Sequence, residues 1–168
     1  MSKKNMTKLA RSEKGGFTLL EVLLVVGIIS ILAGIIILAI NPTKQLGDTR
    51  NAQRRSDVLT ILNALYQYSL DNNGAFPDAI VNSTVDSCDS GTTANEICQD
   101  DGTCTGIMDL YTDLVGASST YLVSMPIDPS TAASAGLGSG YFASLMSNGR
   151  VTVCAPDAEN TATISVTR

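Results

Sequence analysis

The longest hydrophobic run of the chain extends from Phe17 to Ile40 and contains one charged residue, Glu21. As a helix, this run would measure roughly 36 Å at about 1.5 Å per residue, which covers the roughly 30 Å hydrocarbon core of a bilayer. Asn41-Pro42 follows, and proline disturbs a helix because it lacks an N–H and clashes with the preceding turn. The pattern therefore predicts a membrane-spanning helix over residues 17–41.

The pattern then changes to the i, i+3, i+4, i+7 spacing of an amphipathic helix. Its apolar positions are Val58, Leu59, Ile61, Leu62, Leu65, Tyr66 and Leu70. Asp71-Asn72-Asn73-Gly74 supplies a helix stop, and Pro77 follows it. We expect an amphipathic helix over residues 42–73, with one face packed on a folded head and a kink or local melting at Asn41-Pro42.

Residues 140–168 alternate between apolar and polar side chains, as β-strands do. Asn148-Gly149 is a signal for a two-residue hairpin turn, and a further strand is expected from Thr161 to Thr167. Such a sheet needs a partner for its apolar face, and the helix from Val58 to Leu70 offers the large amphipathic surface required. The expected fold class is α+β, with an antiparallel sheet of about three strands packed on the second half of one long helix.

Residues 74–139 form a polar, glycine-rich region between helix and sheet, with a short amphipathic turn predicted over residues 107–114. Three of the four cysteines lie here, at Cys88, Cys98 and Cys104, and the fourth is Cys154. In an exported head they predict two disulfides with three possible connectivities. We favour Cys98 with Cys104 and Cys88 with Cys154; a bridge from Cys88 to Cys98 would overturn that pairing. Zinc is the rival interpretation, but no Cys-x-x-Cys spacing and no histidine supports it.

Charge is unevenly distributed along the chain, which has 168 residues and a formal net charge of -5. Residues 1–16 hold five basic side chains against Glu13, whereas from Asn72 onward acids outnumber basic residues by eleven to two. Basic residues before a membrane helix predict a cytoplasmic N-terminus and an external head. The acidic head argues against a nucleic-acid footprint, because phosphate contacts need clustered Lys or Arg.

Glu21 needs an explanation, because a carboxylate in hydrocarbon costs at least about 2.5 kcal/mol and normally has a partner. No Lys or Arg lies between Phe17 and Pro42. Cleavage between Gly16 and Phe17 would create a new α-amine one helical turn from Glu21. The same amine on a neighbouring subunit could also pair with Glu21 and would set the register between two helices.

A basic leader that ends in glycine, followed by Phe-Thr-Leu-Leu-Glu and a long apolar helix, resembles the type IV pilins and type II secretion pseudopilins over residues 3–40. The resemblance implies that a prepilin peptidase and N-methyltransferase cuts after Gly16 and methylates Phe17. It also implies that Glu21 is the assembly carboxylate. The alternative is an ordinary signal anchor with an isolated Glu.

From this resemblance we expect a structural subunit of a type IV pilus. Its partners would be identical or related subunits, the cytoplasmic membrane and the pilus assembly machinery, and its final location a cell-surface filament. The alternatives are a major pseudopilin of a type II secretion system and a monomeric membrane-anchored binding head. Pro126-x-Asp128-Pro129 weakly resembles the loop before the sheet in pseudopilins, but the Trp-Gly that follows in that family is replaced by Ser130-Thr131.

Other chemistry is weakly signalled. Calcium could bind Asp89, Asp100 and Asp101, or Asp128 with nearby carbonyls, although acidic turns usually only face solvent. An enzyme is not expected, because the chain has no histidine and its acids lie in loops without a nucleophilic or basic partner.

The basic residues Arg50, Arg54 and Arg55 form a cationic band on the amphipathic helix. The band is interpreted either as a surface for acids of adjacent subunits or as a solvated helix face.

Overall fold

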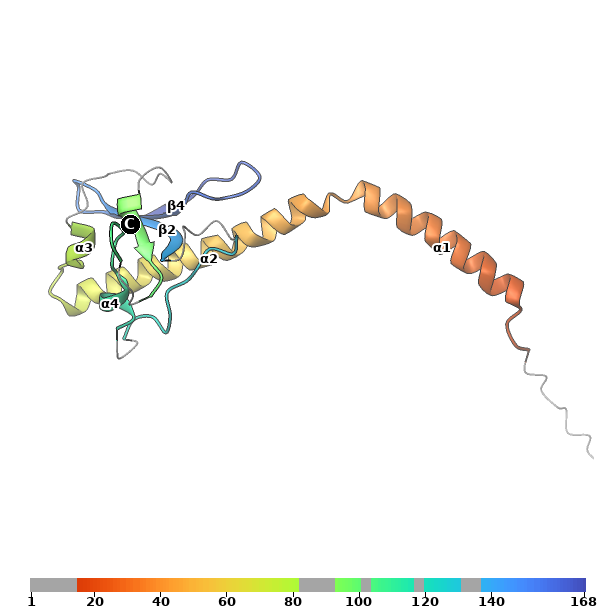
Figure 1. The fold of residues 1–168 in the computed structure, drawn as a ribbon, viewed down its shortest axis with the longest axis horizontal. Coiled ribbons are helices and arrows are strands. Elements are labelled where there is room, and N and C mark those ends of the chain that lie inside the picture. The colour runs from red at the N-terminus through yellow and green to blue at the C-terminus, as the bar shows by residue number, and fades with distance from the viewer. Residues whose placement is uncertain (1–14, 82–92, 101–103, 117–119, 131–136) are drawn as a thin grey trace, which may run out of the picture. The chain divides into compact units, whose positions relative to one another are not determined.

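The computed structural model describes residues 15–81, 93–100, 104–116, 120–130 and 137–168. The chain divides into two compact units, residues 1–42 and residues 43–168 (Figure 1). The first unit contains helix α1, and the second contains helix α2 with the sheet.

Helix α1 extends from Leu19 to Ala39, and none of its residues is buried. Because apolar side chains cover all of its sides, the helix offers no polar face to water. Of the part of the chain that the structure describes, it is the one helix long and apolar enough to cross a membrane. It ends at Ile40, whose backbone is extended with φ -92° and ψ 123°, so the helix is interrupted where proline was expected to disturb it.

Helix α2 extends from Pro42 to Asp71. Proline is tolerated at a first helical position, since the N–H it lacks would have no partner there. The end of the helix follows the predicted stop: Asn73 has φ 55° and Gly74 has φ 91°, and the Gly74 N–H donates to the Ser69 carbonyl.

The sheet has four antiparallel strands in the order β1-β2-β3-β4. Their bounds are Glu96–Cys98, Gly138–Leu145, Val151–Ala155 and Ile164–Thr167. Short helical segments lie at Asp78–Val81 (α3), Thr93–Asn95 (η1) and Tyr111–Leu114 (α4), and α4 falls in the predicted amphipathic turn. The predicted α+β class is confirmed, but the strand count is higher than expected. The additional strand is β1, which pairs with β2 through Glu96 and Phe142.

The hairpin between β2 and β3 differs from the predicted two-residue turn. Met146 and Arg150 still pair, since the Met146 N–H donates to the Arg150 carbonyl over 2.7 Å. Only Gly149 has a positive φ, of 78°. The loop therefore contains three residues and places glycine at its left-handed position, which is the next most common hairpin solution after the two-residue turn.

The core of the second unit lies between α2 and the sheet (Figure 1). Helix α2 contributes Val58, Ile61, Leu62, Ala64 and Leu65, and the sheet contributes Tyr141, Ala143, Val151, Val153, Ala155 and Ile164. All of these core residues are at most 4% exposed. Strand β3 is buried at every position. The alternating pattern therefore identifies the apolar residues that face the helix, but the polar residues between them are not exposed to solvent.

Candidate functional site

The predicted processing site lies just before helix α1. Residues 15–18 are not helical, and all of them are exposed. A Cβ added to Gly15 or Gly16 would meet no atom within 4 Å. No neighbouring atom of the chain therefore requires glycine at these two positions. The Gly16–Phe17 peptide bond lies in an accessible, non-helical segment.

Thr18 is the N-cap of α1, and its side chain accepts a hydrogen bond from the Glu21 N–H over 3.2 Å. Thr18 and Glu21 have the spacing of a capping box, in which the N-cap hydroxyl satisfies the N–H of the residue three positions later. The first turn also favours an acidic side chain, because the helix dipole is positive there. This role of Thr18 was not predicted, although the Thr-x-x-Glu spacing indicates it.

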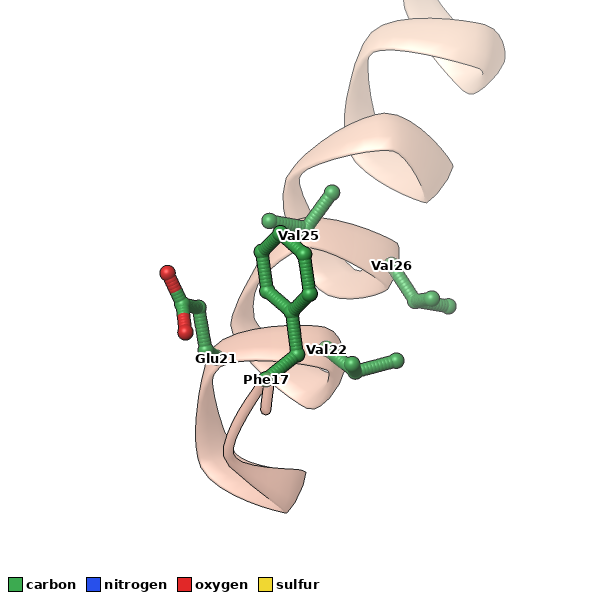
Figure 2. A pocket seen from close by; sticks show the side chains of 5 residues that line it. All are labelled: Phe17, Glu21, Val22, Val25 and Val26. Atoms are coloured by element: carbon green, nitrogen blue, oxygen red, sulfur yellow. The ribbon is translucent and has the colours of Figure 1, made fainter. Parts of the chain in front are cut away.

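Glu21 lies at a shallow hollow on the helix surface, lined by Phe17, Glu21, Val22, Val25 and Val26. Figure 2 shows the Glu21 carboxylate pointing outward beside the Phe17 ring and the valines of the following turns. A second hollow is lined by Gly15, Gly16, Phe17 and Glu21. The structure thus brings together the three residues that the sequence assigns to processing and assembly.

Among the described residues, no salt bridge reaches Glu21. The segment from Phe17 to Pro42 contains no Lys or Arg. The arrangement is therefore a carboxylate on an apolar helix, with an accessible peptide bond one turn away. It can accept an ammonium group supplied from outside the helix.

A second polar site lies in the head, around Arg54. The Arg54 side chain is fully buried, and so is that of Asp128. Arg54 donates from Nε to Asp128 Oδ2 over 2.6 Å and from Nη2 to Oδ1 over 2.9 Å. Burial alone would raise the pKa of the Asp128 carboxyl, but hydrogen bonds from Arg54 and Ser130 together hold that pKa below its ordinary value.

The same network fastens the segment around Glu159 to α2. Arg50 donates to both carboxylate oxygens of Glu159, and Arg54 Nη1 donates to Glu159 Oε1 over 3.2 Å. Asn51 exchanges two hydrogen bonds with the Glu159 backbone, of 2.7 and 2.9 Å. Chiefly through the hydrogen bond from Arg50, the pKa of Glu159 is lowered to about 2.

This network corrects the prediction for the cationic band. Arg50 and Arg54 pair with acids of their own chain, so neither is available as a free cation for an adjacent subunit. The reason is helical register: Arg54 precedes Val58 by four residues and therefore lies on the buried face of α2. Arg55, the next residue, is exposed.

The predicted disulfide between Cys98 and Cys104 is present, with its Cα atoms 5.9 Å apart. Cys154 is also disulfide-bonded, but its predicted partner, Cys88, lies outside the described residues. Two of the predicted calcium ligands, Asp89 and Asp101, lie outside them as well. Asp128 Oδ1 accepts hydrogen bonds from Arg54 and from the Ser130 N–H and hydroxyl, and calcium stays a prediction.

Comparison with known proteins agrees with the N-terminal geometry. The model of the prokaryotic N-terminal methylation motif matches residues 11–37. The type II secretion system core protein G of Aeromonas hydrophila is 38% identical over 78 residues, which are 43% of this chain and 52% of that protein. The chain thus spans about half the length of the curated relative it matches, and no solved structure matches it. Residues 11–37 therefore carry the prokaryotic N-terminal methylation motif, and part of the chain is similar to a type II secretion core protein.

Proposed function

We propose that the chain is a prepilin that is cut between Gly16 and Phe17, methylated at Phe17 and polymerised through α1 into a filament. The observation that carries the proposal is Glu21, a carboxylate in the first turn of an apolar helix that has no cationic partner among the described residues. Cleavage after Gly16 creates an α-amine four residues before Glu21, within reach on the same helical face.

Access to the peptide bond supports the cleavage step. Gly16 and Phe17 are exposed and precede the first helical residue, Leu19. Because no surrounding atom restricts a side chain at Gly16, the need for glycine there comes from the peptidase that must accept this residue. The basic residues of the leader keep that segment on the cytoplasmic side, and the head is exported.

Polymerisation follows from the surface of α1. In the membrane this apolar helix is surrounded by lipid, and in a filament it would be surrounded by copies of itself, so its apolar surface stays dry in both. Small residues allow helices in lipid to approach one another closely, which strengthens their packing. The small residues of α1 are Gly27, Ser30, Ala33 and Gly34. Glu21 of an incoming subunit would pair with the Phe17 amine of a neighbour and fix the axial register between them.

Two kinds of filament fit this proposal. The relative from Aeromonas hydrophila is named as a type II secretion core protein, which favours a pseudopilus. The missing Trp-Gly after Pro129 and the disulfide between Cys98 and Cys104 favour a surface pilus. We infer a type IV pilus subunit, with the pseudopilin as the second candidate. Electron microscopy of surface filaments together with a secretion assay distinguishes them.

The experiment that tests the proposal compares the unmodified chain with Glu21→Ala and with Glu21→Asp, which keeps the charge. The exported unmodified protein should begin at a methylated Phe17, as measured by intact mass and N-terminal sequencing. Glu21→Ala should be cut normally but form at least tenfold fewer filaments, and Glu21→Asp should retain part of the assembly. Normal filaments from Glu21→Ala, or an exported chain that keeps its first sixteen residues, would refute the mechanism.

A further inference from the structure

Strand β4 forms one edge of the sheet, with β3 on its inner side. Arg168, just after β4, and Val151 of β3 exchange two backbone hydrogen bonds, of 3.0 and 3.1 Å. In an antiparallel pair, such bonded positions alternate with positions whose N–H and C=O point away from the neighbouring strand. Counting back from Arg168, the backbone groups of Ser165 and Thr167 therefore point away from β3.

These outward groups face solvent. Both Ser165 and Thr167 are exposed, and among the described residues no backbone hydrogen bond joins either of them to a further segment. The Thr167 side chain has a partner on β3, because its hydroxyl shares a hydrogen bond of 2.8 Å with the Thr152 hydroxyl. The edge thus presents two N–H donors and two C=O acceptors to solvent.

The opposite edge of the sheet is closed by the chain itself. Beside β1, Met108 forms a parallel bridge with Ile97. The Met108 N–H donates to the Glu96 carbonyl over 2.7 Å, and the Cys98 N–H donates to the Met108 carbonyl over 2.9 Å. An extended segment thus adds to this edge through its backbone. For β4, the described part of the chain supplies no such segment.

Strand β4 lacks several features by which proteins keep an open edge unpaired. Such features are Lys or Pro on the edge and a bulge that twists it away. Residues 161–167 contain no charged residue and no proline, and the pairing of β4 with β3 is regular along its length. The strand has four residues, so its edge suits a short extended peptide that adds to the sheet as a further strand.

We propose that the outer edge of β4 binds a short, extended and basic segment of a different protein as an additional strand of the sheet. On the helix side, the segment would lie beside Ile164 and Val166, which pack with the core, so apolar residues are favoured there. On the other side it would lie beside Ser165 and Thr167, which favour small hydroxyl residues. The proposal does not depend on polymerisation, because the edge belongs to a single chain.

Charge decides which occupant is favoured. The bonds offered by two outward residues replace bonds to water and add little affinity by themselves, so the partner needs a further source of affinity. From Asn72 onward the chain has eleven acids against two basic residues, which attracts a basic segment and speeds its encounter with the head. A second copy carries the same excess of acids, so pairing of two β4 edges would bring like charges together.

The first test measures binding of a synthetic peptide to the full chain in detergent by fluorescence anisotropy. The peptide is Lys-Lys-Val-Thr-Val-Thr-Val-Lys-Lys with blocked ends. N-methylation of one alternating set of its residues removes the N–H groups that face β4 and should weaken binding about tenfold. N-methylation of the other set should leave binding unchanged, and the set that is sensitive tells whether the added strand is parallel or antiparallel to β4.

A peptide with Glu in place of every Lys is the control for charge. It should bind about tenfold more weakly than the basic peptide, because the head repels it. Equal binding of the acidic and basic peptides would overturn the basic partner. Equal loss from both N-methylated sets, or no binding of the basic peptide, would overturn the edge as its site.

The second test changes the edge itself. Ser165→Pro removes an outward N–H without removing a bond to β3, and proline is tolerated at such positions of an edge strand. This variant should weaken binding of the basic peptide about tenfold. Ser165→Ala, which keeps the N–H, should bind it normally. The two variants should share one thermal midpoint, and normal binding by Ser165→Pro would contradict the proposal.

Amide hydrogen exchange of the unmodified chain, measured by NMR, tests the edge without a variant. The N–H groups of Ser165 and Thr167 should exchange rapidly in the free chain and about tenfold more slowly with saturating peptide. The Val166 N–H, which points toward β3, should exchange slowly in both samples. Slow exchange of Ser165 and Thr167 in the free chain would overturn the proposal, and light scattering that then shows a dimer would make a second copy the occupant. Absence of filaments would refute the proposed function and leave this test unaffected.

Discussion

Replacing Arg54 with Met should strongly destabilise the head. The Arg54 guanidinium is fully buried and donates two hydrogen bonds to the Asp128 carboxylate, over 2.6 and 2.9 Å. Met fills similar space but leaves Asp128 with Ser130 as its remaining described hydrogen-bond donor. Removing one partner of a buried ion pair costs about 3 to 5 kcal/mol, because the other charge stays buried and uncompensated.

That cost is a large part of the stability of the head. A domain of this size has a free energy of unfolding of roughly 5 to 15 kcal/mol. At about 3 °C per kcal/mol, the loss should lower the thermal midpoint by about 9 to 15 °C. The chain contains no Trp and five Tyr, among which Tyr141 is fully buried. Near-ultraviolet circular dichroism of the full chain in detergent therefore reports unfolding of the head rather than of α1.

The matched control is the double variant Arg54→Met with Asp128→Leu. It removes both charges, and replacing a complete buried pair with apolar residues is often neutral or stabilising. The double variant should therefore recover most of the lost midpoint. The ion pair does not act as described if the double variant loses as much stability as Arg54→Met and Asp128→Leu lose together. The same conclusion follows if Arg54→Met lowers the free energy of unfolding by less than about 1 kcal/mol.

Three further predictions concern the head. The pKa of Glu159 is about 2 in the folded chain against an ordinary 4.5, so the unfolded chain binds the proton first, and the stability that ionised Glu159 contributes should be lost as pH falls from about 4.5 to about 2. In Glu159→Gln the thermal midpoint should depend less on pH over that window. An unchanged pH dependence of the thermal midpoint would contradict this prediction. Replacing Cys98 and Cys104 with Ala should lower the free energy of unfolding by about 2 kcal/mol, from the length of the loop they close; denaturant titration measures this, and no loss would count against it. Burial and the charges of Asp109 and Asp78 raise the pKa of Asp113, which means that its charged form destabilises the head. Asp113→Asn should therefore stabilise the head at neutral pH, by less than about 1 kcal/mol. This stabilisation should shrink as pH falls below the raised pKa. A lower thermal midpoint for Asp113→Asn would speak against that interpretation.

The two long helices and the position of the hairpin could be predicted because each is specified by local chemistry, whereas the three-residue length of the hairpin loop was not predicted. The apolar run ends at Asn41-Pro42, and the structure ends α1 at Ala39 and begins α2 at Pro42. The stop at Asn73-Gly74 is the left-handed turn that asparagine and glycine permit. Periodicity and turn residues are properties of neighbouring positions, so one sequence suffices to read them.

Strand β1 could not be predicted in this way. It has three residues, Glu96 to Cys98, within a polar region that resembles a loop. Its conformation depends on pairing with β2, more than forty residues later, where Gly140 N–H donates to Glu96 Oε1 over 3.1 Å. A Cβ at Gly138 would lie 2.0 Å from that oxygen, so glycine there is required by a contact that the local sequence does not reveal.

The two candidate sites differ in the same way: one is formed by neighbours in sequence and the other by residues far apart in the chain. Gly16, Phe17 and Glu21 are neighbours in sequence, and their spacing alone pointed to a common role. Arg54 and Asp128 are 74 positions apart, and only the fold brings them together. The register of Arg54 with Val58 could have indicated burial, but no local pattern names its partner.

The start of α1 at Leu19 bears on the energetics of maturation. A cut at the Gly16–Phe17 bond would remove no helical residue, and it would leave the Thr18 cap attached to the shortened product. The precursor and the product would therefore share the same helix, and no refolding within lipid would separate them. Processing would change the charge of the helix end rather than its conformation, so a finished subunit could enter a growing fibre as soon as it is released.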